Sequence, residues 1–131
     1  MKRLRPGMGI GIDICQISRI ASILGSPRRA RFLSRILTPD ERAGGEARLK
    51  APLKEEAAFV AGRFAAKEAV MKAFSSTRRL GWQDIEIDIV GARPVGRVVG
   101  RGEGDGGGEE VLVSISHDGD YAAAFCVAGV T

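Results

Sequence analysis

The chain has 131 residues, enough for one domain with a single core and too few for two. Apolar residues make up 44% and charged residues 27%, as in an ordinary globular protein, and no apolar run approaches the roughly 20 residues that a membrane-spanning helix requires. The net charge is +4, and the residues up to Pro39 contain a single acid, Asp13, beside eight basic residues: Lys2, Arg3, Arg5, Arg19, Arg28, Arg29, Arg31 and Arg35. Such a block indicates an acidic partner, namely a phosphate-rich ligand, a nucleic acid or an acidic protein, or else a solvated basic surface.

The first residues, MKRLRPGM, are basic but lack the ~7–15-residue apolar segment of a secretory signal. We therefore expect an intracellular protein, with the cytoplasm and the mitochondrial matrix both open. The two cysteines, Cys15 and Cys126, lie among apolar residues, which predicts buried free thiols and suits a reducing compartment. Their spacing, with His117 as the only histidine, argues against a metal site built from cysteines.

Residues 9–14 alternate strictly and predict a strand with one buried face, formed by Ile10, Ile12 and Ile14. Asp13 shares the opposite face with Gly9 and Gly11, which project no side chain. A ligand or a metal could therefore approach the backbone closely beside a carboxylate. The alternative is an aspartate at the end of a strand that only faces water.

Two helices are predicted next, over residues 18–24 and 28–37, with the breaker Gly25-Ser26-Pro27 between them. Thr38 before Pro39 is a capping signal for a further helix. The sequence of residues 44–53 is irregular or weakly helical.

The strongest helix signal covers residues 55–74, which contain seven alanines and one glycine. Apolar or small side chains surround this helix, which is typical of a buried helix. A buried charge has to be paired or to meet a ligand, so the charged residues here are candidate site residues: Arg63, Lys67, Glu68 and Lys72. The alternative is that Glu68 and Lys72, four residues apart, form a surface pair and that Lys67 extends its ammonium group to solvent.

Residues 84–90 alternate isoleucine with acid and predict a half-buried strand. Residues 100–110 (GRGEGDGGGEE) predict a flexible loop, and strands are expected at 111–116 and 121–127, around the turn signal Asp118-Gly119. Strands and helices are mixed without regular β-α-β alternation, which favours an α+β fold in a single domain over residues 1–131. Ser114, Ser116 and His117 end a strand before the turn, where a lone histidine is more often structural than catalytic.

Several common sites are absent from the sequence. It has no G-x-x-x-x-G-K-[ST] phosphate loop, and the glycines at 7, 9 and 11 miss the dinucleotide-binding spacing because position 12 is isoleucine. Nothing resembles a nucleophile elbow. An aromatic content of 5% supplies little for stacking the bases of single-stranded nucleic acid.

Five segments, in this order and spacing, resemble the small holo-acyl-carrier-protein synthase family of phosphopantetheinyl transferases. They are GIGIDICQISRI (9–20), RFLSRILTPDE (31–41), FVAGRFAAKEAVMKAF (59–74), WQDIEI (82–87) and VSISHDGDYAAAFCV (113–127). The third is the most diagnostic, through its R-F-A-x-K-E-A-x-x-K pattern. The resemblance covers nearly the whole chain, and it implies a small, mostly antiparallel sheet wrapped around one long buried helix.

The resemblance implies an enzyme that transfers 4′-phosphopantetheine from coenzyme A to a serine of an acyl carrier protein. Mg²⁺ is the implied cofactor and adenosine 3′,5′-bisphosphate the leaving group. The resemblance places the metal on Asp13 and Glu68, and catalysis on these two residues and Lys72. Glu68, directly or through a metal-bound water, is the candidate base, and Lys72 stabilises or protonates the leaving phosphate. Contacts with coenzyme A are implied for Arg63, Phe64, Lys72, Pro94, Ser116 and His117.

The resemblance also implies a homotrimer with active sites between subunits, and docking of the acidic carrier protein on a basic surface: Arg19, Arg28, Arg29 and Arg31. It gives no role to nucleic acid or a membrane. Three segments depart from the family pattern: Gln16 stands where many relatives carry glutamate, residues 75–77 replace a glycine-rich turn, and residues 101–110 are unusually rich in glycine. Two rival hypotheses remain, a noncatalytic basic module that binds nucleic acid or an acidic protein, and a metal-free acyltransferase that uses coenzyme A.

Overall fold

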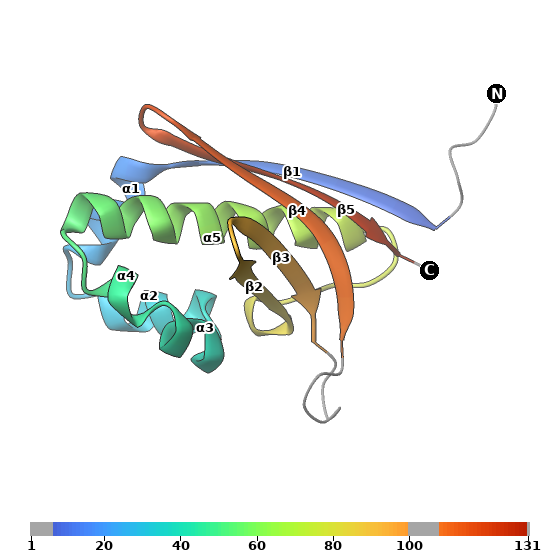
Figure 1. Cartoon of the computed structure of the whole chain (residues 1–131), viewed down its shortest axis with the longest axis horizontal. Helices are drawn as coiled ribbons and strands as arrows, with labels where there is room; N and C mark the ends of the chain where they lie inside the picture. Colours follow the sequence, from blue (N-terminus) through green and yellow to red (C-terminus); the bar gives the residue numbers. More distant parts are fainter. Residues whose placement is uncertain (1–6, 100–107, 131) are drawn as a thin grey trace.

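The computed structural model describes residues 7–99 and 108–130, in which a five-stranded antiparallel sheet curves around one long helix (Figure 1). The strand order is β1-β5-β4-β3-β2. The strands are β1 (Met8–Gln16), β2 (Ile85–Val90), β3 (Arg93–Val98), β4 (Glu109–Asp118) and β5 (Tyr121–Gly129). The predicted α+β class, with a sheet around one long helix, is confirmed.

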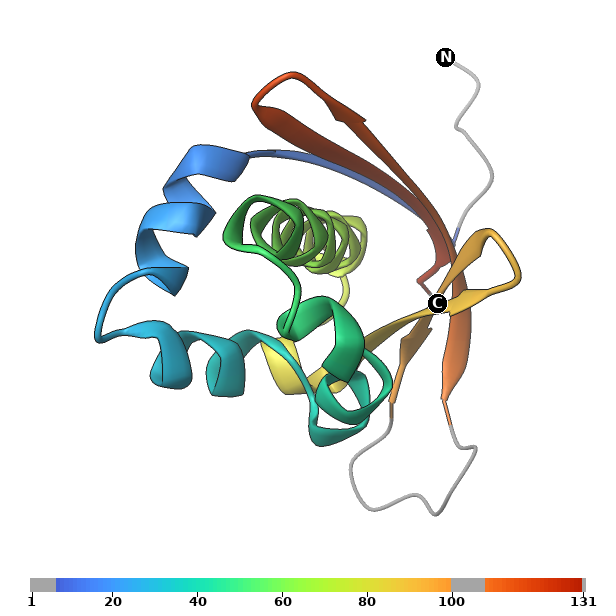
Figure 2. The same cartoon turned by 60° about the vertical axis from the view of Figure 1, so that its left-hand side comes forward.

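The long helix α5 (Leu53–Phe74) lies inside the curve of the sheet, and shorter helices close the other side (Figure 2). They are α1 (Ile17–Leu24), α2 (Arg29–Ile36), α3 (Pro39–Gly44) and α4 (Glu46–Leu49), while one 3-10 turn, η1 (Trp82–Asp84), leads into β2. The short helix α4 lies in the segment expected to be irregular or weakly helical. Within the described ranges, no helix combines the length and the apolar character needed to cross a membrane.

Helix α5 is buried on nearly all sides, as its composition predicted. Its buried side chains are mostly alanine and valine, but they include three charged ones: Glu56, Arg63 and Lys67. Arg29 forms a two-pronged ion pair with Glu56, with Nη1–Oε1 and Nη2–Oε2 distances of 2.6 and 2.5 Å. The pair joins α2 to α5, and it satisfies a carboxylate that would otherwise be costly to bury.

Strand β1 packs on α5 through its glycines, which reverses the predicted burial of the strand. A Cβ atom on Gly11 would lie 1.8 Å from the carbonyl oxygen of Ala69, and one on Gly9 would lie 2.0 Å from that of Ala73. The helix backbone therefore fills the space that the sequence predicted as open to a ligand. The isoleucines face outward, with exposed fractions of 67, 65 and 66% for Ile10, Ile12 and Ile14. Alternation correctly separates the two faces, but hydrophobicity is a wrong guide to the buried one because the helix backbone leaves no room for a side chain at positions 9 and 11.

Strand β3 is missing from the sequence prediction because its residues, RPVGRV, include a proline and a glycine, which are both rare inside strands. Its pairing with β2, from Ile85↔Val98 to Val90↔Arg93, makes it a strand. The predicted flexible loop 100–110 lies mostly outside the described residues, and its last two residues begin β4.

The cysteines are buried free thiols, as predicted, and burial raises the pKa of Cys15 and of Cys126 to about 11. Such thiols stay protonated and inert near neutral pH. They therefore belong to the core and not to a reactive site.

The hairpin between β4 and β5 turns at Gly119, whose φ of +57° favours glycine, and Asp120. The Asp120 carboxylate accepts hydrogen bonds from the backbone N and the Oγ of Ser18, at 2.9 and 2.6 Å. The backbone carbonyl oxygen of Asp120 accepts a hydrogen bond from the backbone N of Ile17 at 2.7 Å. The turn thereby caps the N-terminus of α1, whose own residues supply no side-chain cap.

We predict that Gly11→Ala lowers the free energy of unfolding by about 3 kcal/mol or more, because the added methyl group would collide with helix backbone that has no other rotamer. Urea unfolding followed by far-UV circular dichroism measures the change. Gly129→Ala is the matched control, since a Cβ atom at this position of the same sheet has no heavy atom within 4 Å. Equal unfolding midpoints for Gly11→Ala and the wild type would contradict the close contact.

Candidate functional site

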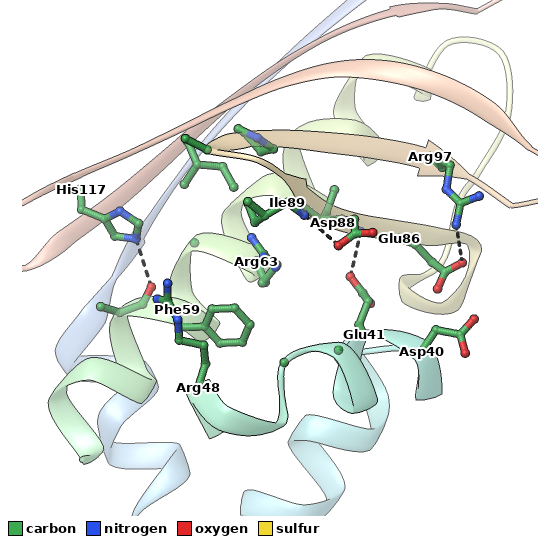
Figure 3. Close-up of a pocket in the computed structure, with 18 of the residues that line it drawn as sticks. Asp40, Glu41, Arg48, Phe59, Arg63, Glu86, Asp88, Ile89, Arg97 and His117 are labelled. Carbon is green, nitrogen blue, oxygen red and sulfur yellow. Dashed lines mark hydrogen bonds and ion pairs between the residues drawn. The ribbon is translucent and has the colours of Figure 1, made fainter. Parts of the chain in front are cut away.

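A cavity of about 770 Å³ lies between α5, the α3–α4 segment and the β2–β3 hairpin (Figure 3). The α3–α4 segment supplies one wall, with Glu41 and Arg48, and the hairpin supplies the opposite wall, with Asp88 and Pro94. The floor comes from the first half of α5: Ala58, Phe59, Gly62 and Arg63. A cavity of this size suits a small organic ligand or cofactor.

Two guanidinium groups approach one aromatic ring in this cavity. The Arg63 Cζ atom lies 4.8 Å from the centroid of the Phe59 ring, and the Arg48 Cζ atom lies 5.9 Å from it. Burial lowers the pKa of Arg63, while the nearby Glu41 and Asp88 carboxylates act in the opposite direction. Guanidinium groups bind phosphate oxygens through two parallel hydrogen bonds, so this corner of the cavity can hold a phosphate-bearing ligand.

His117 lies at the edge of the cavity floor, where its Nε2 atom is 3.1 Å from the carbonyl oxygen of Ala58 (Figure 3). Because a carbonyl oxygen only accepts hydrogen bonds, Nε2 carries the proton and Nδ1 is the free nitrogen of the neutral ring. Gly62 allows this contact, since a Cβ atom there would lie 3.1 Å from Nε2 and 3.3 Å from Cε1. Gly62 is not among the residues predicted from the sequence, although a lone glycine in an alanine-rich helix is a signal of close packing.

Asp13, Glu68 and Lys72 form a second group, the carboxylate–lysine group, where β1 crosses α5. The Lys72 Nζ atom lies 3.0 Å from Asp13 Oδ1 and 3.0 Å from the carbonyl oxygen of Ile12. Burial raises the pKa of the Glu68 carboxyl, the charge of Asp13 raises it further, and Lys72 lowers it. Lys72 therefore pairs with Asp13, whereas the surface-pair alternative placed it on Glu68.

The two carboxylates fit a magnesium site that substrate oxygens complete. Mg²⁺ in proteins is usually held by one or two carboxylates, with waters and substrate phosphates in the remaining positions. Asp13 and Glu68 supply that number, and Asp13 already attracts the cationic group of Lys72. Over residues 7–99 and 108–130, no set of three or more His, Cys, Asp or Glu side chains is placed to hold a metal ion, so an all-protein cage is not formed there.

The cavity and the carboxylate–lysine group lie on different sides of α5. A helix turns about 100° per residue, so Glu68, five residues after Arg63, points roughly 140° away from it and Lys72 roughly 180° away. His117 meets the helix at Gly62, which is about 9 Å before Glu68 along the helix axis. Within one chain, the two sets of residues therefore face different sides of α5.

Comparison with known proteins assigns the family. Residues 9–126 match the family described as the 4′-phosphopantetheinyl transferase superfamily. The chain belongs to this superfamily. The resemblance of the five sequence segments is thereby confirmed.

Two relatives are bacterial proteins named holo-[acyl-carrier-protein] synthase. That of Myxococcus xanthus is 39% identical over 121 residues, covering 91% of this chain and 92% of its own, and that of Geobacillus kaustophilus is 45% identical over 120 residues, covering 89% and 84%. The crystal structure of a holo-(acyl-carrier-protein) synthase from Bacillus anthracis, in complex with CoA (3′,5′-ADP), matches with a TM-score of 0.70 at 34% identity and covers 94% of this chain and 96% of the other.

Three of the positions that the phosphopantetheinyl transferase resemblance assigned to coenzyme A line the cavity: Arg63, Pro94 and His117. Phe64 lies elsewhere, with its ring stacked between Phe32 and Trp82 at centroid distances of 6.2 and 4.9 Å. Ser116 is exposed and alternates with His117 along β4, so it lies on the outer face of the sheet. Lys72 belongs to the carboxylate–lysine group.

The four arginines predicted for carrier docking differ in their surroundings. Arg19, Arg28 and Arg31 are exposed on α1 and around the start of α2. Arg29 is held by its ion pair with Glu56 and by a hydrogen bond from Nη2 to the carbonyl oxygen of Leu49 at 3.2 Å. Its guanidinium group therefore supports the fold, a contact that the sequence did not reveal.

We predict that Gly62→Ala displaces the His117 ring from Ala58, because a neighbour at 3.1 Å has to move away from the new methyl group. Since His117 is the only histidine, the imidazole ¹⁵N signals report on it without ambiguity, and the share of the Nε2–H tautomer should fall. Gly44→Ala is the matched control, because Gly44 also lines the cavity but has open space at its Cβ position. Unchanged imidazole signals in Gly62→Ala would refute the contact.

Proposed function

We propose that this protein is a holo-[acyl-carrier-protein] synthase, which transfers 4′-phosphopantetheine from coenzyme A to a serine hydroxyl of an apo acyl carrier protein. The reaction releases adenosine 3′,5′-bisphosphate and depends on Mg²⁺. The observation that carries the proposal is the arrangement on α5, with a guanidinium-bearing cavity on one side and two carboxylates with a lysine on the other. The relative solved with CoA (3′,5′-ADP) supports coenzyme A as the donor.

In this proposal the nucleotide end of coenzyme A occupies the cavity. Its phosphates bind Arg63 and Arg48, which approach the same ring of Phe59. His117, held through Nε2 by the backbone, offers its other ring nitrogen to the ligand. Pro94 adds apolar contact from β3.

The carboxylate–lysine group then carries out the transfer. The serine Oγ attacks the phosphorus atom attached to pantetheine, and the bond from that phosphorus to the bridging oxygen of the nucleotide breaks. Glu68 accepts the serine proton, directly or through a water, which a carboxyl with a raised pKa does well. The Lys72 ammonium group moves from Asp13 to the leaving phosphate and neutralises its charge. When bound by Asp13 and Glu68, Mg²⁺ would polarise the phosphoryl oxygens as a Lewis acid.

We further infer a homotrimer whose active sites are shared between subunits. Since the two sets of residues lie on opposite sides of α5, a second copy of the chain has to bring the missing set to each site. The outer face of β1, β5 and β4 offers an apolar surface for this contact, with exposed fractions of 65% for Ile12, 56% for Leu112 and 42% for Phe125. A monomer seldom leaves such a surface in water, and head-to-tail contacts of one kind close into a ring.

Carrier docking is proposed on the exposed arginines of α1 and α2: Arg19, Arg28 and Arg31. Exposed charges of this kind accelerate the encounter with an acidic protein and are screened by salt. The bacterial origin of the relatives supports the cytoplasm as the location, and nothing supports the mitochondrial alternative.

Intact-mass analysis of an apo acyl carrier protein, incubated with this protein, coenzyme A and Mg²⁺, tests the proposed reaction. We predict a gain of one phosphopantetheine group that EDTA prevents. Asp13→Asn and Glu68→Gln should remain folded and lower the rate at least about a hundredfold, since they remove the metal ligands and the base. A gain that survives EDTA would remove the metal from the mechanism, and no gain with any of several carriers would favour the noncatalytic basic module.

Subunit mixing tests the shared site. We predict that Asp13→Asn and Arg63→Met are each inactive alone but regain about a quarter of wild-type activity when co-expressed one to one, because a quarter of randomly formed subunit contacts join two intact halves. Ile12→Lys, placed in both chains, serves as the control, since a charge on the apolar face should prevent assembly and recovery together. Mixed trimers without any activity would place both sets of residues in one subunit.

A further inference from the structure

The α3–α4 wall of the cavity, residues 39–49, has little apolar attachment to the protein. Neither helix contributes a residue to the buried apolar core, and only Leu49, at the end of α4, is among the apolar residues packed partly against it. The wall nevertheless carries Arg48, and a Cβ atom on Gly45 would lie 3.0 Å from Cζ of Phe59. Its position therefore decides the shape of the cavity and the place of one of the two guanidinium groups.

A buried ion pair holds this wall against α5. Lys67, which is 0% exposed, places its Nζ atom 2.5 Å from Glu41 Oε1 and 2.9 Å from the carbonyl oxygen of Trp82. The Glu41 carboxylate also accepts hydrogen bonds from the backbone N atoms of Thr38 and Ile87, both at 2.9 Å. One carboxylate thus joins α3, α5 and β2, and Figure 3 shows Glu41 pointing from α3 toward the sheet.

Polar contacts extend from this pair to the far wall. The Thr38 hydroxyl donates to Glu86 Oε2 at 2.8 Å and accepts from the backbone N of Glu41 at 3.2 Å. The Oε1 atom of Glu86 in turn lies 3.5 Å from the Nη2 atom of Arg97 on β3. The two walls of the cavity are therefore linked twice, directly between Glu41 and Ile87 and through the contact of Thr38 with Glu86.

Stability alone gives no reason to keep such a pair. Apolar side chains of similar volume are often as stabilising as a buried ion pair, whereas the pair has a defined geometry in which each charged atom needs its partner. Directional contacts fix one position of the wall, while apolar contacts would permit sliding. The position of the wall matters only if a ligand has to fit beneath it.

We propose that Glu41 and Lys67 are positioning residues for coenzyme A, whose ion pair fixes the α3–α4 wall and so holds Arg48 beside Arg63 at the Phe59 ring. This inference rests on the proposed function, because it takes coenzyme A as the ligand of the cavity. Neither residue touches the reacting atoms, which lie at the carboxylate–lysine group on the other side of α5. The pair should therefore affect the binding of coenzyme A and leave the transfer step unchanged.

The double variant Glu41→Gln/Lys67→Met tests this role, because it removes both charges together and nearly preserves the side-chain lengths. We expect a cooperatively folded protein with a KM for coenzyme A raised roughly tenfold, or ~1.4 kcal/mol, and a kcat within about twofold of the wild type. Hydrogen exchange without ligand should be faster in residues 39–49 and unchanged in α1. Glu46→Gln/Lys50→Met is the matched control on the same wall, since that ion pair is exposed to solvent and should change neither KM nor exchange.

An unchanged KM for coenzyme A in the folded Glu41→Gln/Lys67→Met variant would overturn the proposal. The same rise in KM and the same fall in kcat in both double variants would also overturn it. If the charge-free variant does not fold, hydrogen exchange of the wild type decides: coenzyme A should slow exchange in residues 39–49 more than in α1, and equal protection of both would refute the role. A wild-type protein that does not bind coenzyme A at all would instead refute the proposed function. In that case, faster hydrogen exchange of residues 39–49 in the double variant would still show that the Glu41–Lys67 ion pair fixes the α3–α4 wall.

Discussion

Direct contact between the backbone of α5 and the glycines of β1 sets the geometry of the candidate active site. With no side chain between Gly11 and Ala69, the strand lies near enough to the helix for Asp13 to meet Lys72 and to raise the pKa of Glu68. Any larger residue would separate the two elements and with them the two carboxylates. The same contact turns the isoleucines of β1 outward, so one strand carries both the proposed metal ligand Asp13 and an exposed apolar face.

Helix α5 lies between the cavity that carries Arg63 and the carboxylate–lysine group of Asp13, Glu68 and Lys72. It is too deeply buried to leave a charge without a partner, and each buried charge on it meets a specific group: Glu56 meets Arg29, Lys67 meets Glu41, and Arg63 meets the face of Phe59. In the proposed function, ligand binding uses the side that carries Arg63, and the transfer uses the side that carries Glu68. The proposed sharing of the active site between subunits rests on this division.

The sequence predicted the features that depend on local composition. The alanine-rich segment predicted α5 and its burial, the Asp118-Gly119 signal predicted the hairpin, and the charges on α5 were expected to need partners. Which partners they have was not predictable, because Lys67 and Glu41 are 26 residues apart and Lys72 and Asp13 are 59 apart. Only the family resemblance joined Asp13 to Glu68 and Lys72.

The failures have a common cause, since each depends on a contact made at long range. β1 was assigned the wrong buried face because the alternation says nothing about what packs on either side. The resemblance assigned Phe64 to coenzyme A, and no sequence pattern indicates that its ring packs against Trp82. Arg48 was overlooked because its segment looked irregular or weakly helical. Gly62 matters through its contact with His117, which is 55 positions later in the chain.

The pairing of β1 with β5 has a consequence for synthesis of the protein. Met8 pairs with Gly129 and Gln16 with Tyr121, so the first described strand finds its neighbour in the last one. On the ribosome, α5 is available to cover the glycine face long before β5 has emerged. During that interval the outer face of β1 and the backbone edge that β5 will occupy are open to other chains, and uncovered edges of this kind template aggregation. A newly made chain is therefore prone to association until Tyr121–Gly129 have paired with β1, whatever the stability of the finished fold.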